Sequence, residues 1–188
     1  MNDQLSMPPS NRLSYALMGP ADTQLLFELD QDAEVMRYIN GGKMTSMQEI
    51  HDVFIPRMVK YTNPTKGWGL WQVRVTANDE FIGWILVRPM NYFTDNPSWD
   101  DWELGWRFKR KAWGAGYATE AAQHIMQTLA SSQDVGIFSA IAMPDNLASI
   151  AVMKKLGMQY TKTAMHKDPL GDMEVVYYQV KAEKIRNT

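Results

Sequence analysis

The segment from Trp102 to Ala130 constrains the fold more than any other part of the sequence. Strand-like residues up to Phe108 lead through a basic turn to Gly114 and Gly116, which stand directly before a helical pattern. A strand that passes through a glycine turn into an amphipathic helix is typical of domains in which helices pack against a sheet. The helical pattern is strong because small and apolar residues recur on one face, namely Ala118, Ala122, Ile125, Met126 and Leu129.

Helix and strand signals also alternate along the rest of the chain. This order predicts an α/β fold with a mixed sheet covered by helices on both faces. Residues 88–101 contain two prolines and three aromatic residues and are predicted to form a long loop, a candidate wall of a substrate site. We predict the other strands over residues 13–18, 70–75, 81–87, 137–143, 158–163 and 174–180, and the other helices from Asp22, over 32–39, from Ser46 and over 147–156. Ser46, with Glu49 three residues further on, has the pattern of a capping box at the start of its helix.

Length and composition bound the class of protein. The 188 residues suit one domain, which we expect over residues 1–188 with flexible ends at 1–10 and 181–188. The absence of cysteine excludes disulfides, thiolate metal sites and a cysteine nucleophile, and it indicates a reducing, cytoplasmic location. A net charge of -2 argues against direct binding of nucleic acid. The longest apolar run, from Phe81 to Val87, is far shorter than the roughly 20 residues that cross a membrane, so we expect no membrane partner.

The glycine turn has the chemistry of a phosphate-binding loop. The start of a helix exposes unpaired N–H groups and about half a positive charge, and the basic residues 109–111 are expected to strengthen that field. A plain helix entry is the simpler alternative. The dinucleotide pattern is incomplete because Thr119 stands at its third glycine position, and the P-loop pattern is missing. The spacing Lys111-x-x-Gly114-x-Gly116 resembles instead the pyrophosphate loop of the GNAT acyltransferases.

The resemblance to this superfamily extends over nearly the whole chain, in the family's order. It is most similar to the RimJ/RimL-type branch of the GNAT N-acetyltransferases. The resemblance implies a mostly antiparallel sheet of six to seven strands, in which the fourth and fifth strands splay apart. The matching segments are residues 32–39 (DAEVMRYI), 81–84 (FIGW), 103–106 (ELGW), 113–121 (WGAGYATEA) and 146–158 (NLASIAVMKKLGM).

The resemblance implies that acetyl-CoA binds as co-substrate in the gap between the splayed strands. Asn146 matches the family asparagine that bonds the pantetheine arm, although a plain helix N-cap is its alternative role. Lys111 stands where the family usually has glutamine or arginine. The remaining expected contacts are the backbone groups of Trp106, Arg107 and Phe108 with the pantetheine and thioester, and those of Trp113, Gly114, Ala115, Gly116, Tyr117 and Ala118 with the pyrophosphate.

The catalytic residues are less well marked. Many GNAT enzymes have an acidic tyrosine where this chain has Met153, and the resemblance implies that Ser149 instead hydrogen-bonds the departing thiolate. A bond from this serine to the carbonyl four residues back is an equal alternative. Glu103 is the leading candidate for the general base, against the alternative of a solvated carboxylate at a strand end. Asp168 and His166 are further candidates that can act through water.

The acceptor is expected to be a primary amine, either of a small molecule or of a protein N-terminus. Trp68, Trp99 and Trp102 flank loops and are candidates for an acceptor pocket. The three histidines have no carboxylate spacing for a metal, so we expect none. A homodimer through an exposed sheet edge is compatible with the pattern. Since the chain has no thiol to carry an acyl group, direct transfer is the simplest route. An acyl-CoA-binding module without catalysis is the main alternative function.

Overall fold

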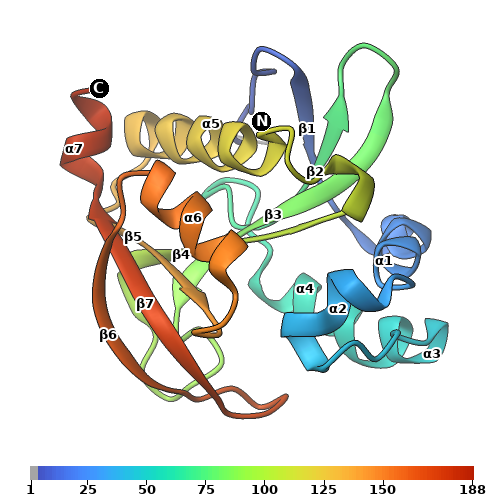
Figure 1. Ribbon diagram of the computed structural model, residues 1–188. Helices are drawn as coiled ribbons and strands as arrows, with labels where there is room; N and C mark the ends of the chain where they lie inside the picture. Colours follow the sequence, from blue (N-terminus) through green and yellow to red (C-terminus); the bar gives the residue numbers. More distant parts are fainter. Residues whose placement is uncertain (1–3) are drawn as a thin grey trace.

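The computed structural model describes residues 4–188, which form one sheet of seven strands with helices on both faces (Figure 1). The strand order is β1-β2-β3-β4-β5-β7-β6, and neighbours are antiparallel except for β4 and β5. The predicted mixed, mostly antiparallel sheet is therefore confirmed. The strands are β1 (Leu13–Leu17), β2 (Gly69–Val75), β3 (Glu80–Met90), β4 (Ser98–Phe108), β5 (Ile137–Ala142), β6 (Gln159–His166) and β7 (Met173–Lys181).

The helices form two groups, each with its own apolar contacts to the sheet. α5 and α6 belong to the larger core, in which Ile125 and Leu129 are fully buried. α1, α2 and α4 pack against β2 and β3 in a second core around Leu29 and Met58. A π-helical turn, Ile50–Phe54, connects α3 to α4 just before Pro56. The helices are α1 (Thr23–Leu29), α2 (Ala33–Asn40), α3 (Met47–Glu49), α4 (Ile55–Tyr61), α5 (Tyr117–Ser132), α6 (Leu147–Lys155) and α7 (Ala182–Arg186).

The predicted long loop over residues 88–101 is wrong at both ends. β3 continues to Met90 and β4 begins at Ser98, with Arg88 opposite Glu103 and Pro89 opposite Trp102. A proline is tolerated here because the pairing of β3 with β2 ends at Val87, so the missing N–H interrupts no ladder on that side. The connecting loop is thus limited to residues 91–97.

The C-terminal end is packed, contrary to the expected flexible tail at 181–188. β7 runs through Lys181, and α7 packs against α5. Arg186 fixes this contact by donating from Nε to the Ala130 carbonyl at 2.6 Å. At the other end Leu5 donates its N–H to the Pro64 carbonyl at 2.9 Å. The part of the flexible-end expectation that concerns residues 1–3 lies outside the described chain.

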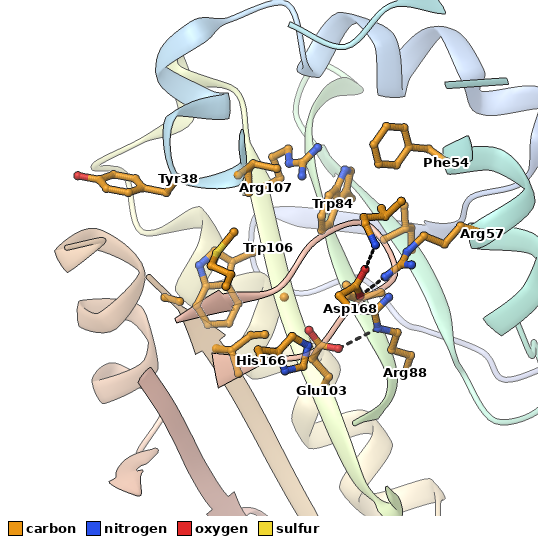
Figure 2. Close-up of a pocket in the computed structure, with 18 of the residues that line it drawn as sticks. Tyr38, Phe54, Arg57, Trp84, Arg88, Glu103, Trp106, Arg107, His166 and Asp168 are labelled. Carbon is orange, nitrogen blue, oxygen red and sulfur yellow. Dashed lines mark hydrogen bonds and ion pairs between the residues drawn. The ribbon is translucent and has the colours of Figure 1, made fainter. Parts of the chain in front are cut away.

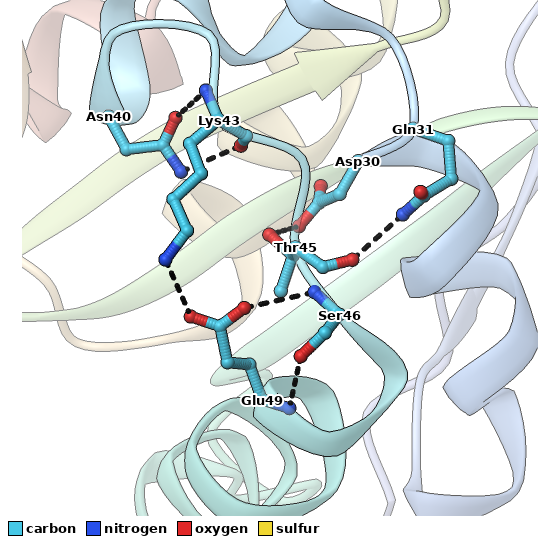
Figure 3. Close-up of polar contacts among 7 residues, drawn as sticks. All are labelled: Asp30, Gln31, Asn40, Lys43, Thr45, Ser46 and Glu49. Atoms are coloured by element: carbon cyan, nitrogen blue, oxygen red, sulfur yellow. Dashed lines mark hydrogen bonds and ion pairs between the residues drawn. The ribbon is translucent and has the colours of Figure 1, made fainter.

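Polar side chains fix the loop over residues 41–46 that connects α2 to α3 (Figure 3). The Asn40 side chain both donates to the Lys43 carbonyl and accepts from the Lys43 N–H, each at 2.9 Å. Ser46 and Glu49 form the predicted capping box, with both reciprocal hydrogen bonds present. This loop is therefore held from both ends, next to the helices that cover the central strands.

The expected separation of the fourth and fifth strands is confirmed. β4 and β5 pair at only three positions, Asp101 with Ile137, Trp102 with Phe138, and Glu103 with Ser139. Beyond Glu103 the strands diverge, so the β5-facing backbone groups of residues 104–108 have no strand partner. Such unpaired groups at the end of a ladder are available to a ligand.

A buried carboxylate lies where β4 and β5 still pair. Asp101 accepts from the Ser139 hydroxyl at 2.6 Å and from the Gln179 amide at 3.3 Å. Burial is the largest effect on its pKa and raises it to about 6, although the Ser139 hydrogen bond acts in the opposite direction. From about pH 4 to pH 6 the folded state therefore holds a proton that the unfolded state has lost. Its stability falls as pH rises across that range.

Asp101→Asn is expected to remove this loss. Relative to the natural chain, the free energy of unfolding of the variant should rise by about 2 kcal/mol between pH 4 and pH 7, because the cost of the buried charge disappears. Urea unfolding at both pH values measures the effect. Ser139→Ala serves as the opposite control: without its hydrogen bond the pH dependence should steepen. Parallel stability curves for Asp101→Asn and the natural chain would contradict this account.

Candidate active site

One cavity of about 340 Å³, the α5 cavity, lies where the end of β4 meets the glycine turn and α6. Its wall contains ten of the residues that the sequence predicted for CoA or catalysis. Three of the predicted residues, Glu103, Lys111 and Ala115, are not part of this wall. The ten are Trp106, Arg107, Phe108, Trp113, Gly114, Gly116, Tyr117, Ala118, Asn146 and Ser149.

The glycine turn has the backbone that a phosphate loop needs. Gly114 and Gly116 have φ values of +75° and +78°, a conformation that side chains strongly disfavour. A Cβ at Gly114 would meet no heavy atom within 4 Å, so the space beside it is open. Within the described chain the N–H groups of residues 114–119 donate to no backbone or side-chain acceptor. They surround the N-terminus of the 16-residue helix α5, whose dipole favours an anion.

Arg12, which directly precedes β1, binds this turn from the N-terminal part of the chain. Its Nη1 donates to the Ala115 carbonyl at 2.9 Å, and its Nε donates to Glu120 Oε2 at 2.6 Å. The guanidinium also lies 4.4 Å from the centre of the Tyr117 ring. The sequence analysis did not identify this contact, because it joins residues more than 100 positions apart. We call these contacts of Arg12 the Arg12 clamp. The Ala115 carbonyl accepts from this clamp, and Ala115 does not line the cavity.

The basic turn does not supply the free positive charge that was expected. Each of its three cations is bound to a carboxylate of another element, so their charges are largely neutralised. Lys111 in particular is directed to the start of β3. The pairs are Lys109 with Glu28 at 4.0 Å, Arg110 with Asp32 at 3.0 Å, and Lys111 with Glu80. The anion site therefore depends on the backbone and on the α5 dipole.

The N-terminus of α6 contributes two polar side chains to the cavity. Asn146 Oδ1 caps the helix by accepting the Ser149 N–H at 3.2 Å, which leaves the amide Nδ2 as a donor. The Ser149 hydroxyl makes no hydrogen bond within residues 4–188, so the alternative bond to the carbonyl four residues back is not formed. Met153 is 1% exposed and belongs to the core.

A second cavity of about 390 Å³, the α4 cavity, lies against α1, α4 and the β6–β7 loop (Figure 2). Its polar residues form three arginine–carboxylate ion pairs, and each pair joins two different elements. The pairs are Arg88 Nε with Glu103 Oε2 at 2.8 Å, Arg107 Nη1 with Asp30 Oδ1 at 2.7 Å, and Arg57 with Asp168. Asp30 in turn accepts from the Thr45 hydroxyl, which connects this site to the loop of Figure 3.

Glu103 is buried in this cavity and is not the solvated strand-end carboxylate that was the alternative. Only 5% of the residue is exposed, and Arg88, directly across the β3–β4 ladder, binds Oε2. Burial disfavours the Arg88 charge, but the neighbouring Glu103 outweighs this effect and the pKa of Arg88 is raised. No group of the described chain hydrogen-bonds Glu103 Oε1. This oxygen can therefore accept a proton without displacing Arg88.

The two other base candidates also line the α4 cavity. Asp168 is fully engaged, since Arg57 binds Oδ2 and the Leu170 N–H donates to Oδ1 at 2.8 Å. His166 Nδ1 shares a hydrogen bond of 2.9 Å with the Tyr177 hydroxyl. Burial, with a smaller contribution from Glu103, raises the pKa of that tyrosine. Of these two candidates, His166 keeps its second ring nitrogen without a hydrogen-bond partner among residues 4–188.

The expected acceptor pocket of Trp68, Trp99 and Trp102 is wrong. These rings pack on one another, with Trp68 and Trp99 stacked at 6.1 Å and Trp68 and Trp102 edge to face at 5.6 Å. None of them lines either cavity, and Trp99 lies in the part of β4 that replaces the end of the predicted loop. The indoles of the α4 cavity are Trp84 and Trp106 instead.

The two cavities meet where β4 and β5 separate. Six residues line both, namely Tyr38, Ile39, Trp106, Arg107, Asn146 and Ser149. Groups bound on the two sides can thus contact each other at this point. Among the described residues, no cluster of metal-ligating side chains and no helix that could cross a membrane was found.

Comparisons with known proteins show which family has this fold and these sequence motifs. The family model of the acetyltransferase (GNAT) domain matches residues 12–159. The FsC-acetyl coenzyme A-N(2)-transacetylase of Aspergillus fumigatus is 31% identical over 161 residues, which cover 83% of this chain and 66% of that protein. The chain therefore spans just under two thirds of this relative.

Two solved structures share the fold. A ribosomal alpha-N-protein acetyltransferase, RimL, solved in complex with coenzyme A, superposes with a TM-score of 0.71 at 16% identity and covers 93% of this chain and 97% of its own. The acetyltransferase AAC(6')-Ib, in complex with ribostamycin and coenzyme A, gives 0.75 at 15% identity and covers 95% and 99%. With the family model over most of its length and the splayed strands in place, the chain belongs to the GNAT family of acetyl-CoA-dependent acetyltransferases.

Proposed function

We propose that the protein transfers an acetyl group from acetyl-CoA to a primary amine by direct attack in a ternary complex. The observation that carries the proposal is the meeting of the two cavities at Asn146 and Ser149. Acetyl-CoA would occupy the α5 cavity and the amine the α4 cavity. The name of the Aspergillus relative, an acetyl-CoA N-transacetylase, supports nitrogen as the acceptor atom.

The α5 cavity offers hydrogen-bond donors that match the polar groups of a CoA molecule. The free N–H groups of residues 114–119 would bind the pyrophosphate, and Lys155 in the cavity wall would face a phosphate. The free Nδ2 of Asn146 and the unpaired backbone of residues 106–108 would bind the pantetheine arm and the thioester. Acetyl-CoA supplies the activated acyl group.

The reaction requires an uncharged amine. The amine nitrogen forms a bond to the thioester carbon, the carbon–sulfur bond breaks, and the thiolate leaves toward Ser149, whose hydroxyl can donate a hydrogen bond to it. The proton that the nitrogen loses as the amide forms passes to this thiolate and gives CoA as the free thiol. Deprotonation at pH 7 costs about 1.4 kcal/mol for an α-amine and about 4.6 kcal/mol for a lysine-type amine. Glu103 is the proposed acceptor of this proton, through Oε1.

Both acceptor classes of the sequence analysis remain within this proposal. The likeness to RimL is compatible with a RimJ/RimL-type enzyme that acts on protein N-termini, and the likeness to AAC(6')-Ib with one that acts on small amines. At these identities the two structures share only the fold with the chain, so they do not choose between the classes.

Thiol release from acetyl-CoA in the presence of an amine panel tests the proposal. We expect amine-dependent release in the natural chain, and a rate about 10- to 100-fold lower in Ser149→Ala, because the departing thiolate loses a hydrogen bond. Binding of CoA, measured by calorimetry, should change little in this variant. Tight CoA binding without release for any amine would favour the alternative, a CoA-binding module.

A further inference from the structure

The α4 cavity is balanced in charge. The carboxylates that line it, Asp30, Glu103 and Asp168, are each bound to one arginine, and the exposed fractions of these six side chains lie between 4% and 15%. Tyr61, whose pKa burial raises to about 12, adds no charge. His166, which also lines the cavity, contributes no negative charge. A ligand with several ammonium groups would therefore find no carboxylate without a partner among the described residues of this wall.

The rest of the wall is apolar and aromatic. Phe54, Trp84 and Leu86 are among the side chains that line it. The arginines are themselves held against rings, since Arg107 lies 5.0 Å from the Trp84 ring centre and Arg57 lies 3.8 Å from that of Phe93. Such a lining favours the burial of an apolar body beside a small number of polar groups.

The cavity is also closed across one side. Arg57 on α4 binds Asp168 in the β6–β7 loop, and both side chains line the cavity, so the ion pair ties two of its walls together (Figure 2). The side chains of this pair are each 15% exposed. A volume of about 390 Å³ is at the small end for ligand sites. A small molecule would fit this volume whole, whereas a polypeptide acceptor could enter it only with its N-terminal residues.

From these observations we propose that the acceptor is a small primary amine with a single amino group on an apolar or aromatic body. The proposal rests on the amine acetylation argued above. It excludes polyamines and aminoglycoside-like polycations as preferred acceptors, since each additional ammonium group would enter a neutral, largely buried site without a partner charge.

Steady-state kcat/KM values for 2-phenylethylamine, spermidine and a hexapeptide with a free N-terminus test the proposal. We expect the value for 2-phenylethylamine to exceed each of the others by at least about tenfold. Equal or higher values for spermidine or the peptide would overturn it while leaving the acetylation itself intact. If no amine releases thiol although CoA binds, the proposed function fails instead, so the two failures are distinguishable.

Arg57→Gln provides a second test, because it leaves the Asp168 carboxylate without its guanidinium. The ratio of kcat/KM for spermidine to that for 2-phenylethylamine should rise about tenfold or more in this variant. The ratio is independent of the fraction of folded enzyme, since both substrates meet the same preparation. Arg74→Gln, which removes an arginine paired with Asp79 outside the cavity, is the matched control and should leave the ratio unchanged. An unchanged ratio in Arg57→Gln would contradict the charge argument.

Discussion

Replacing Gly114 by aspartate is expected to weaken CoA binding at least about 100-fold, a loss of about 2.7 kcal/mol. The new carboxylate would stand beside the free N–H groups at the start of α5, where the proposed ligand is itself anionic. The φ of +75° adds strain to any residue with a Cβ. Because a Cβ at this position would have no heavy atom within 4 Å, the fold should otherwise be preserved.

Two matched variants separate charge from strain in this prediction. Gly114→Asn has nearly the same shape without the charge, and it should lose much less affinity than the aspartate. Gly41→Asp introduces the same residue at a φ of +81°, also with no atom within 4 Å, but at the end of α2 and outside both cavities. Calorimetry with CoA should find that variant close to the natural chain. If Gly114→Asp binds CoA as tightly as Gly41→Asp does, the glycine turn is not the pyrophosphate site.

The features that could be predicted from the sequence are those set by neighbouring residues. The glycine turn before α5 was predicted because only glycine readily adopts its backbone, and the capping box at Ser46 because its partners lie three residues apart. The separation of β4 from β5 followed from the family resemblance rather than from periodicity.

The features that were missed depend on contacts between distant elements. The Arg12 clamp on Ala115 spans 103 positions, and the Arg107–Asp30 pair spans 77. The cations of residues 109–111 looked free because their partners, including Glu80, come from other elements. Of these contacts, the ion pair of Arg88 with Glu103 was the easiest to predict from the sequence. Once β3 and β4 are placed in register, the two residues stand opposite each other.

The register of β3 and β4 also gives the two carboxylate oxygens of Glu103 different surroundings. Oε2 is held by Arg88, which fixes the side chain in the α4 cavity, and Oε1 makes no hydrogen bond to the described chain. A carboxylate that is buried and oriented in this way can take a proton from a bound amine directly or through one water. The geometry thus supports the base assignment more strongly than the strand pattern alone did.

Glu103→Gln is accordingly expected to lower kcat about 10²- to 10⁴-fold, since glutamine keeps the shape but cannot accept the proton. The loss should be smaller for amines that are already uncharged at the assay pH, and raising the pH should recover part of the rate.

Asp30→Asn is the matched control, because it removes another buried carboxylate that is paired with an arginine of the same cavity. Both variants weaken a buried ion pair, and their free energies of unfolding should fall by comparable amounts, up to about 3 kcal/mol. Only Glu103→Gln should change the shape of the profile of kcat/KM against pH. If both profiles keep the natural shape, Glu103 only positions Arg88, and the free nitrogen of His166 becomes the group to replace next.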